Sequence, residues 1–117
     1  MILGWSFKAN TNDSRESASI YVSEKLFDSG ANLLIYDPKV SKRQVLSDIE
    51  FYWKLKREKI NETKIEVIND SNICKDINAV LILTEWEEFK KLDFKDKPVF
   101  DGRNILKKTN VNYLGKA

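Results

Sequence analysis

The residues of this chain best suited to chemistry are cations at three separated points. Lys8 and Arg15 lie near the N-terminus, and Arg103 lies near the C-terminus. Ammonium and guanidinium groups bind phosphate and carboxylate, and the planar guanidinium does so with two parallel hydrogen bonds. If the fold brings these side chains together, they would form a site for an anionic ligand, such as a nucleotide.

General acid–base, nucleophilic and metal chemistry have few candidates here. Histidine is absent, and Cys74 is the single cysteine. Without a histidine, this thiol has no obvious activating base, and a structural zinc site lacks its usual ligands. We therefore predict no catalytic residue and no metal ligand in the chain, and we interpret Cys74 as a buried structural thiol in a short helix.

The overall charge selects no macromolecular partner. The 20 basic and 18 acidic residues leave a formal net charge of +2, so no strong field would attract a polyanion or a membrane surface. Aromatic and basic residues alternate over 51–57, which could indicate nucleic-acid binding, but an amphipathic helix with solvated lysines also explains this pattern. We expect neither a nucleic-acid nor a membrane partner. A single cysteine without a signal peptide indicates a reducing, cytoplasmic location.

Short apolar runs alternate with amphipathic stretches, which is the pattern of βα units. The runs at 33–35 and 80–83 are continuous, as in strands that are buried on both faces. We predict one domain over 1–117 with an α/β fold, a Rossmann-like three-layer sandwich whose mainly parallel sheet has about five to six strands. The predicted strands are 2–5, 32–36, 65–68, 79–83, 99–100 and 111–114.

The first helix has the clearest predicted boundaries. Asp13 and Glu16 have the spacing of a capping box, which would place Arg15 in the first turn. Gly30 would end the helix. Further helices are expected over 41–59, 71–77 and 85–92.

In an open parallel sheet, ligands bind beyond the carboxyl ends of the strands. The segments in that position are 6–12, 37–39, 84–86 and 101–104. The first contains Lys8 and leads to a helix N-terminus, whose free N–H groups favour an anion. This turn has only Gly4, whereas a dinucleotide fingerprint needs three glycines. Side chains as well as backbone amides would therefore have to bind the phosphates.

Each candidate also has a simpler interpretation. A cation in the first turn of a helix costs about 0.3–1 kcal/mol, which makes Arg15 a functional candidate, but it could equally pair with Asp13. The Asp101-Gly102-Arg103 segment is a common turn sequence, in which the arginine could be a solvated charge. Trp86 could line the ligand edge or pack on the sheet.

In order along the chain, these segments resemble the C-terminal, UDP-binding domain of the UDP-glucose 6-dehydrogenase family. The matching motifs are Leu3-Gly4-Trp5-Ser6-Phe7-Lys8, Thr11-Asn12-Asp13-Ser14-Arg15-Glu16-Ser17, Ile35-Tyr36-Asp37-Pro38-Lys39-Val40, Thr84-Glu85-Trp86 with Phe89, and Val99-Phe100-Asp101-Gly102-Arg103-Asn104. Each motif is weak alone, but together they cover essentially the whole chain. Ala9 and Asn10 depart from the family pattern, and residues 49–63 match poorly.

The resemblance implies a UDP-sugar-binding domain of an NAD-dependent enzyme. Such enzymes oxidise the C6 hydroxyl of UDP-glucose to the carboxylate of UDP-glucuronate, in two hydride transfers to NAD. By motif matching, Phe7, Lys8 and Arg103 would bind the UDP-sugar, and Arg15 would lie towards NAD. The matched residues in supporting positions are Asp101, Gly102, Glu85 and Trp86.

The resemblance also implies what this chain lacks. In the family, the NAD fingerprint and the catalytic cysteine lie in other domains, upstream of this one. We therefore expect the isolated chain to be inactive and to need NAD-binding and central domains, in an enzyme that forms a homo-oligomer. The alternative is a stand-alone nucleotide-binding or assembly module without catalysis.

Overall fold

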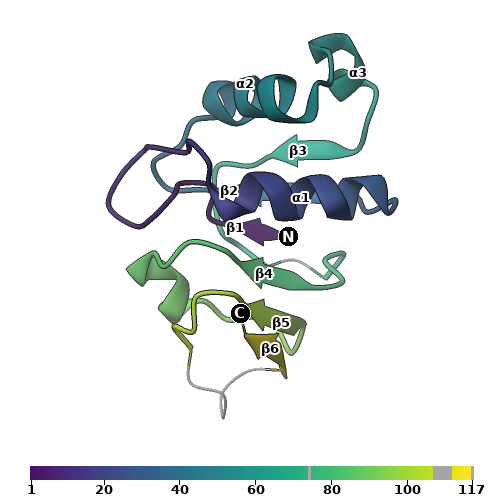
Figure 1. Cartoon of the computed structure of the whole chain (residues 1–117). Coiled ribbons are helices and arrows are strands. Elements are labelled where there is room, and N and C mark those ends of the chain that lie inside the picture. The colour runs from purple at the N-terminus through teal and green to yellow at the C-terminus, as the bar shows by residue number, and fades with distance from the viewer. Residues whose placement is uncertain (74, 107–111, 117) are drawn as a thin grey trace.

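Six parallel strands form the centre of the fold, in the order β3-β2-β1-β4-β5-β6 (Figure 1). The computed structural model describes residues 1–73 and 75–106, and the backbone of 112–116. Every pair of neighbouring strands is parallel. This is the strand order of a Rossmann fold, so the predicted α/β class and parallel sheet are confirmed. The strands are β1 (Ile2–Leu3), β2 (Leu33–Tyr36), β3 (Ile65–Val67), β4 (Val80–Ile82), β5 (Pro98–Asp101) and β6 (Asn112–Lys116).

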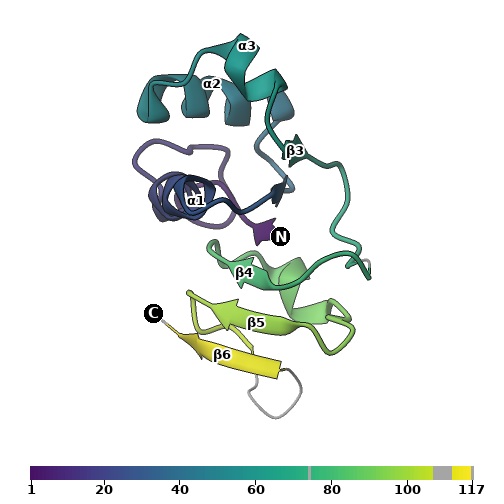
Figure 2. The ribbon, with the colours of Figure 1, turned by 90° about the vertical axis from the view of Figure 1, so that its right-hand side faces the viewer.

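The two faces of the sheet are covered unequally. Figure 2 shows α1 (Ala18–Asp28) and α2 (Lys42–Trp53) on one side of the strands, and the segment that joins β3 to β4 on the other. Right-handed crossovers require this change of side, because the chain runs outwards from β1 to β3 and then restarts at β4. The third layer is therefore irregular chain and one 3₁₀-helix, η1 (Glu87–Lys91).

Successive strand residues supply two separate cores because they point to opposite faces of the sheet. Ile2 and Ile35 belong to the cluster beneath α1 and α2, whereas Leu3 and Ile82 belong to the cluster that includes Phe89 of η1. All five side chains are 1% exposed or less. Burial on both faces explains why the apolar runs of β2 and β4 are continuous in the sequence.

The first helix begins later than predicted. Glu16 has a φ of 58°, a left-handed conformation that a helix cannot include, and Ser17 is the N-cap with an extended ψ of 148°. The predicted capping box of Asp13 and Glu16 is therefore wrong, and Arg15 does not lie in the first turn. Gly30 ends the helix as predicted, with a φ of 95° and the paired N–H bonds of a Schellman motif.

The predicted 41–59 helix is two helices. Lys54 takes a left-handed φ of 58° and ends α2, and α3 (Arg57–Asn61) follows. The helix expected at 85–92 is the shorter η1, and the described residues of 71–77 contain no helix. Cys74 and Val111, which fall in predicted elements, lie outside the described residues. Within the described part of the chain, no helix is long and apolar enough to cross a membrane.

Candidate functional site

The predicted ligand edge lies where the strand order reverses. β1 and β4 are neighbours in the sheet, but the chain leaves them towards opposite faces, which opens a crevice beyond their carboxyl ends. The loop after β1 carries Phe7 and Lys8, and Glu85 follows β4. Arg103 follows β5, which pairs with β4. The fold therefore places these predicted site residues at one edge of the sheet.

Phe7 and Lys8 are exposed at the start of the β1–α1 loop. Phe7 is 53% exposed, so its ring is open to solvent. Its backbone N–H donates to the carbonyl of Asp13 at 2.7 Å and closes the loop at its base. Ala9 is half-buried and packs against the core cluster of η1. The loop is thus closed by a backbone hydrogen bond, and it exposes the Phe7 ring and the Lys8 ammonium to solvent.

Glu85 connects this loop to Arg103. The Arg103 guanidinium donates to Glu85 Oε2 at 3.1 Å, and each side chain is about a third exposed. Burial opposes ionisation of Glu85, but its own backbone N–H, the charge of Arg103 and the backbone N–H of Ala9 together hold its pKa below the ordinary value. Glu85 Oε1 is buried without a well-formed hydrogen bond among the described residues. The Glu85 carboxylate thus lies between the β1 loop and Arg103, the residue of the β5 loop that is predicted to bind an anion.

Asp101 and Gly102 build the turn that presents Arg103. Asp101 is fully buried and accepts hydrogen bonds from the backbone N–H groups of Arg103, at 3.2 Å, and Leu106, at 2.8 Å. The N–H of Gly102 donates to the carbonyl of Ile82 at 2.9 Å, and a Cβ on this residue would lie 3.1 Å from that oxygen. The absence of a side chain lets the two backbones approach this closely.

Trp86 is part of the core beneath this edge. The residue is 7% exposed and belongs to the cluster of η1. Its indole N–H donates to Asp37 Oδ2 at 3.1 Å and to Ser6 Oγ at 3.3 Å. Of the two interpretations of Trp86, the structure shows packing on the sheet.

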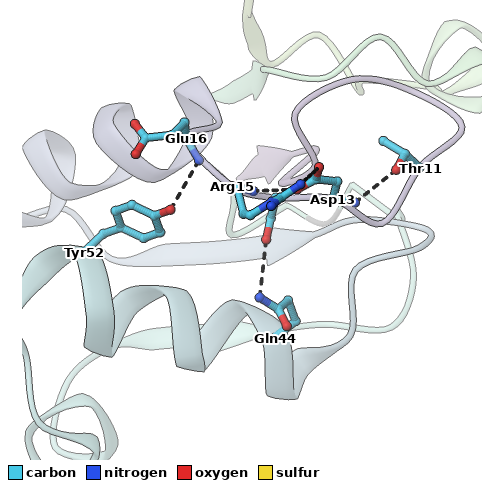
Figure 3. A network of polar contacts seen from close by, with 7 residues as sticks. Thr11, Asp13, Arg15, Glu16, Gln44 and Tyr52 are labelled. Carbon is cyan, nitrogen blue, oxygen red and sulfur yellow. Dashed lines mark hydrogen bonds and ion pairs between the residues drawn. The ribbon is translucent and has the colours of Figure 1, made fainter.

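Arg15 forms an ion pair of its own, outside the Glu85–Arg103 pair. Figure 3 shows its guanidinium directed at Asp13, with which it forms two hydrogen bonds of 3.0 Å. The hydrogen bonds from Arg15 lower the pKa of Asp13 to about 2. The Arg15 side chain is 83% exposed, so the pair leaves most of it in solvent. The simpler interpretation of Arg15, a pair with Asp13, is the arrangement found.

One buried carboxylate behind the site, Asp48, was missed from the sequence, and Asp37 was placed at the carboxyl edge without a role. Asp37 follows β2 and is 8% exposed, and Asp48 lies on α2 and is 6% exposed. Asp48 accepts hydrogen bonds from the Trp5 indole at 2.9 Å and from the Ser14 hydroxyl, at opposite ends of the β1–α1 loop. One signal existed for Asp48: it lies three residues after Val45, on the face of the helix that buries Val45 and Ile49.

The hollows of the surface do not by themselves identify this edge. A hollow of about 860 Å³ lies at the amino ends of the strands, where its charged groups are Lys64, Glu66, Asp76 and the N-terminal ammonium of Met1. That balance of charge does not suit a polyanion. A smaller hollow of about 340 Å³ lies beside β2 and β3 at the carboxyl edge. No group of His, Cys, Asp or Glu side chains among the described residues could hold a metal ion.

Comparison with known proteins identifies the family. The model of the UDP-glucose/GDP-mannose dehydrogenase family, UDP binding domain, matches residues 1–108. A UDP-glucose 6-dehydrogenase from Bos taurus is 41% identical over 113 residues, which are 90% of this chain and 23% of the relative. UDP-glucose 6-dehydrogenase 1 from Arabidopsis thaliana is 38% identical, over 97% of this chain and 27% of the relative.

A solved structure has the same fold. The UDP-glucose dehydrogenase from the archaeon Pyrobaculum islandicum superposes with a TM-score of 0.70 at 26% identity, over 98% of this chain and 23% of that one. The chain therefore spans about a quarter of the length of the relatives that it matches. With its strand order, its carboxyl-edge residues and this sequence match, the chain belongs to the UDP-glucose/GDP-mannose dehydrogenase family, as its UDP-binding domain.

Proposed function

We propose that the domain binds the UDP part of a UDP-sugar at the carboxyl edge of β1, β4 and β5. The observation that carries the proposal is the convergence at this edge: Glu85 is ion-paired with Arg103, and the backbone of Ala9, next to Lys8, acts on the same carboxylate. Cations held at the switch point of a Rossmann sheet suit a diphosphate.

Each predicted residue has a physical role in this proposal. Lys8 supplies a compact charge for a phosphate, and Arg103 supplies a planar fork for phosphate or carboxylate. The exposed ring of Phe7 offers a flat apolar surface to the base or sugar. Because Arg103 is already paired with Glu85, an anionic ligand would compete with that carboxylate or share the guanidinium with it.

The residues present fit only a small part of NAD. Where a dinucleotide fold needs an open glycine-rich turn, a Cβ on Gly4 would lie 2.4 Å from Thr84, so the backbone of this turn is already covered. Arg15 is the residue we place towards the cofactor, because its largely exposed guanidinium keeps free donor capacity beside Asp13. When bound, NAD would accept the hydrides that the sugar C6 loses. The rest of its binding site would come from outside this domain.

We infer that the domain acts within an NAD-dependent UDP-glucose 6-dehydrogenase. The support is the sequence identity to UDP-glucose 6-dehydrogenases of animals and plants over nearly the whole chain. The NAD-binding and central domains, a homo-oligomeric assembly and a cytoplasmic location belong to this proposal. The chain itself would bind substrate without turnover.

Calorimetric titration of the purified chain with UDP and with UDP-glucuronate, at low salt, tests the proposal. We expect Lys8→Ala and Arg103→Ala each to raise the Kd for UDP about ten- to a hundredfold, since a hydrogen bond to a charged group is worth about 1.5–3 kcal/mol. Uridine, which has no phosphate, should bind far more weakly than UDP.

Lys64→Ala is the matched control, because it removes the same charge at the amino edge of the sheet. Equal losses in Lys8→Ala and Lys64→Ala would mean that general charge attraction, not a site, binds the ligand. Reduction of NAD by the chain alone with UDP-glucose would overturn the inference that catalysis needs other domains.

A further inference from the structure

One buried carboxylate at the ligand edge, that of Asp37, is held by hydrogen bonds rather than by an ion pair. Asp37 Oδ2 accepts hydrogen bonds from the backbone N–H of Trp5 at 2.7 Å, from the N–H and hydroxyl of Ser6 at 3.0 and 3.1 Å, and from the indole of Trp86 at 3.1 Å. Its Oδ1 accepts from the N–H groups of residues 39–40, at 2.8 and 3.0 Å. Within the described chain, no positive side chain forms an ion pair with it.

These donors come from three different loops, which follow β1, β2 and β4. A buried carboxylate is costly unless hydrogen bonds satisfy it, so the lowest-energy arrangement keeps all the donors in place together. Asp37 therefore fixes the position of the β1 loop relative to the β2 and β4 loops.

Ser6, the residue before Phe7, shows how completely the β1 loop is held. Its N–H and hydroxyl donate to Asp37, and its carbonyl accepts from the hydroxyl of Thr84 at 2.8 Å. Its hydroxyl oxygen also accepts from Trp86. Every polar atom of Ser6 is thus engaged, and Phe7 leaves this anchor in a fixed direction.

We propose that Asp37 is a positioning residue for nucleotide binding, which presets the Phe7–Lys8 segment against the β4 loop before the ligand arrives. Asp37 acts through Ser6 and Trp86, since its own oxygens are occupied by their donors. A preset loop loses less conformational entropy on binding, which raises affinity. The inference rests on the proposed UDP site.

The test is Asp37→Asn, studied by amide hydrogen exchange and UDP titration on ¹⁵N-labelled chain. Asparagine keeps one acceptor oxygen but turns an NH₂ group towards N–H donors. We expect the amides of Ser6 and Phe7 to exchange at least tenfold faster, with the helical amide of Val22 unchanged, and the Kd for UDP to rise about tenfold. Asp93→Asn is the matched control, because it removes an exposed carboxylate that also caps a nearby N–H.

A merely structural role would raise exchange at Ser6, Phe7 and Val22 together and leave the affinity of the folded fraction unchanged; that result overturns the proposal. Wild-type affinity despite a loosened loop would also overturn it. If the wild type binds no UDP, the proposed function fails, and the exchange data alone still decide whether Asp37 holds the loop. Should Asp37→Asn not fold, Ser6→Ala removes only the hydroxyl bonds, and unchanged exchange at Phe7 would refute the idea.

Discussion

At the scale of single residues, five acidic side chains near the carboxyl edge fall into two kinds. Asp37, Asp48 and Asp101 are buried and satisfied by N–H and O–H donors, and each of them fixes a loop or a turn at the carboxyl edge. Asp13 and Glu85 are partly exposed and pair with arginines. The buried carboxylates fix the loops of the proposed site, whereas the partly exposed carboxylates hold the arginines that a ligand would meet there.

The Asp13–Arg15 pair makes a pH prediction. Hydrogen bonds from Arg15 lower the pKa of Asp13 from 3.8 to about 2, so any stability from the pair is complete above pH 4 and is lost as the pH falls through 2. We expect Arg15→Ala to return the Asp13 pKa towards its ordinary value in a carboxyl NMR titration. Arg57→Ala, which breaks a different ion pair, should leave it unchanged. An Asp13 pKa still near 2 without Arg15 would mean that another group lowers it.

At the scale of elements, the site depends on how closely β1 and β4 approach at their ends. Gly4 follows β1 with a φ of 101°, and its carbonyl accepts from the Ser19 hydroxyl of α1 at 2.7 Å. The side chain of Thr84, after β4, occupies the space where a Cβ of Gly4 would be. The tight turn at Gly4 therefore lets Ser6 reach Asp37 and Thr84.

Two glycine substitutions separate backbone strain from steric overlap. Gly30 has a φ of 95° like that of Gly4, but no atom lies within 4 Å of the position that a Cβ would take there, so Gly30→Ala should cost about 1–2 kcal/mol of unfolding free energy. Gly4→Ala adds an overlap with Thr84 and should cost about 2–5 kcal/mol. Urea unfolding measures both, and equal losses would contradict the close approach of β1 and β4.

At the scale of the whole molecule, the two layers over the sheet differ in how much regular helix they contain. One face has α1 and α2, whereas the other has η1 and irregular segments (Figure 2). Phe89 of η1 is fully buried there, together with Trp86 and Phe94. The thinner layer relies on a few large side chains because it has no long helix to supply an apolar face.

A pair of phenylalanine substitutions tests this dependence. Phe89→Ala should cost about 3–5 kcal/mol, because it removes a fully buried ring from the thin layer. Phe51→Ala, at a residue that is 66% exposed on α2, should change stability by less than about 0.5 kcal/mol. Thermal or urea unfolding compares them, and a small loss for Phe89→Ala would show that other contacts hold the third layer.

Periodicity and local chemistry predicted most of the fold. The continuous apolar runs of β2 and β4 and the terminating Gly30 are local signals, since each depends on a few neighbouring residues. The predicted start of α1 failed because Asp13 and Glu16 have other partners: Asp13 binds Arg15, and the N–H of Glu16 donates to Tyr52 of α2 at 3.4 Å. Those contacts favour a left-handed turn at Glu16 over a capping box.

The sequence by itself determined the class of fold, and it predicted a ligand edge with Phe7, Lys8 and Arg103 as candidates there. The fold class follows from the alternation of apolar runs and amphipathic stretches, and the candidates follow from motifs in their order along the chain. Only the tertiary structure decided that Arg15 is paired with Asp13 and that Asp37 holds three loops together. The role of Asp37 depends on contacts between residues tens of positions apart, and the free energy of burying a carboxylate is settled only where those segments meet.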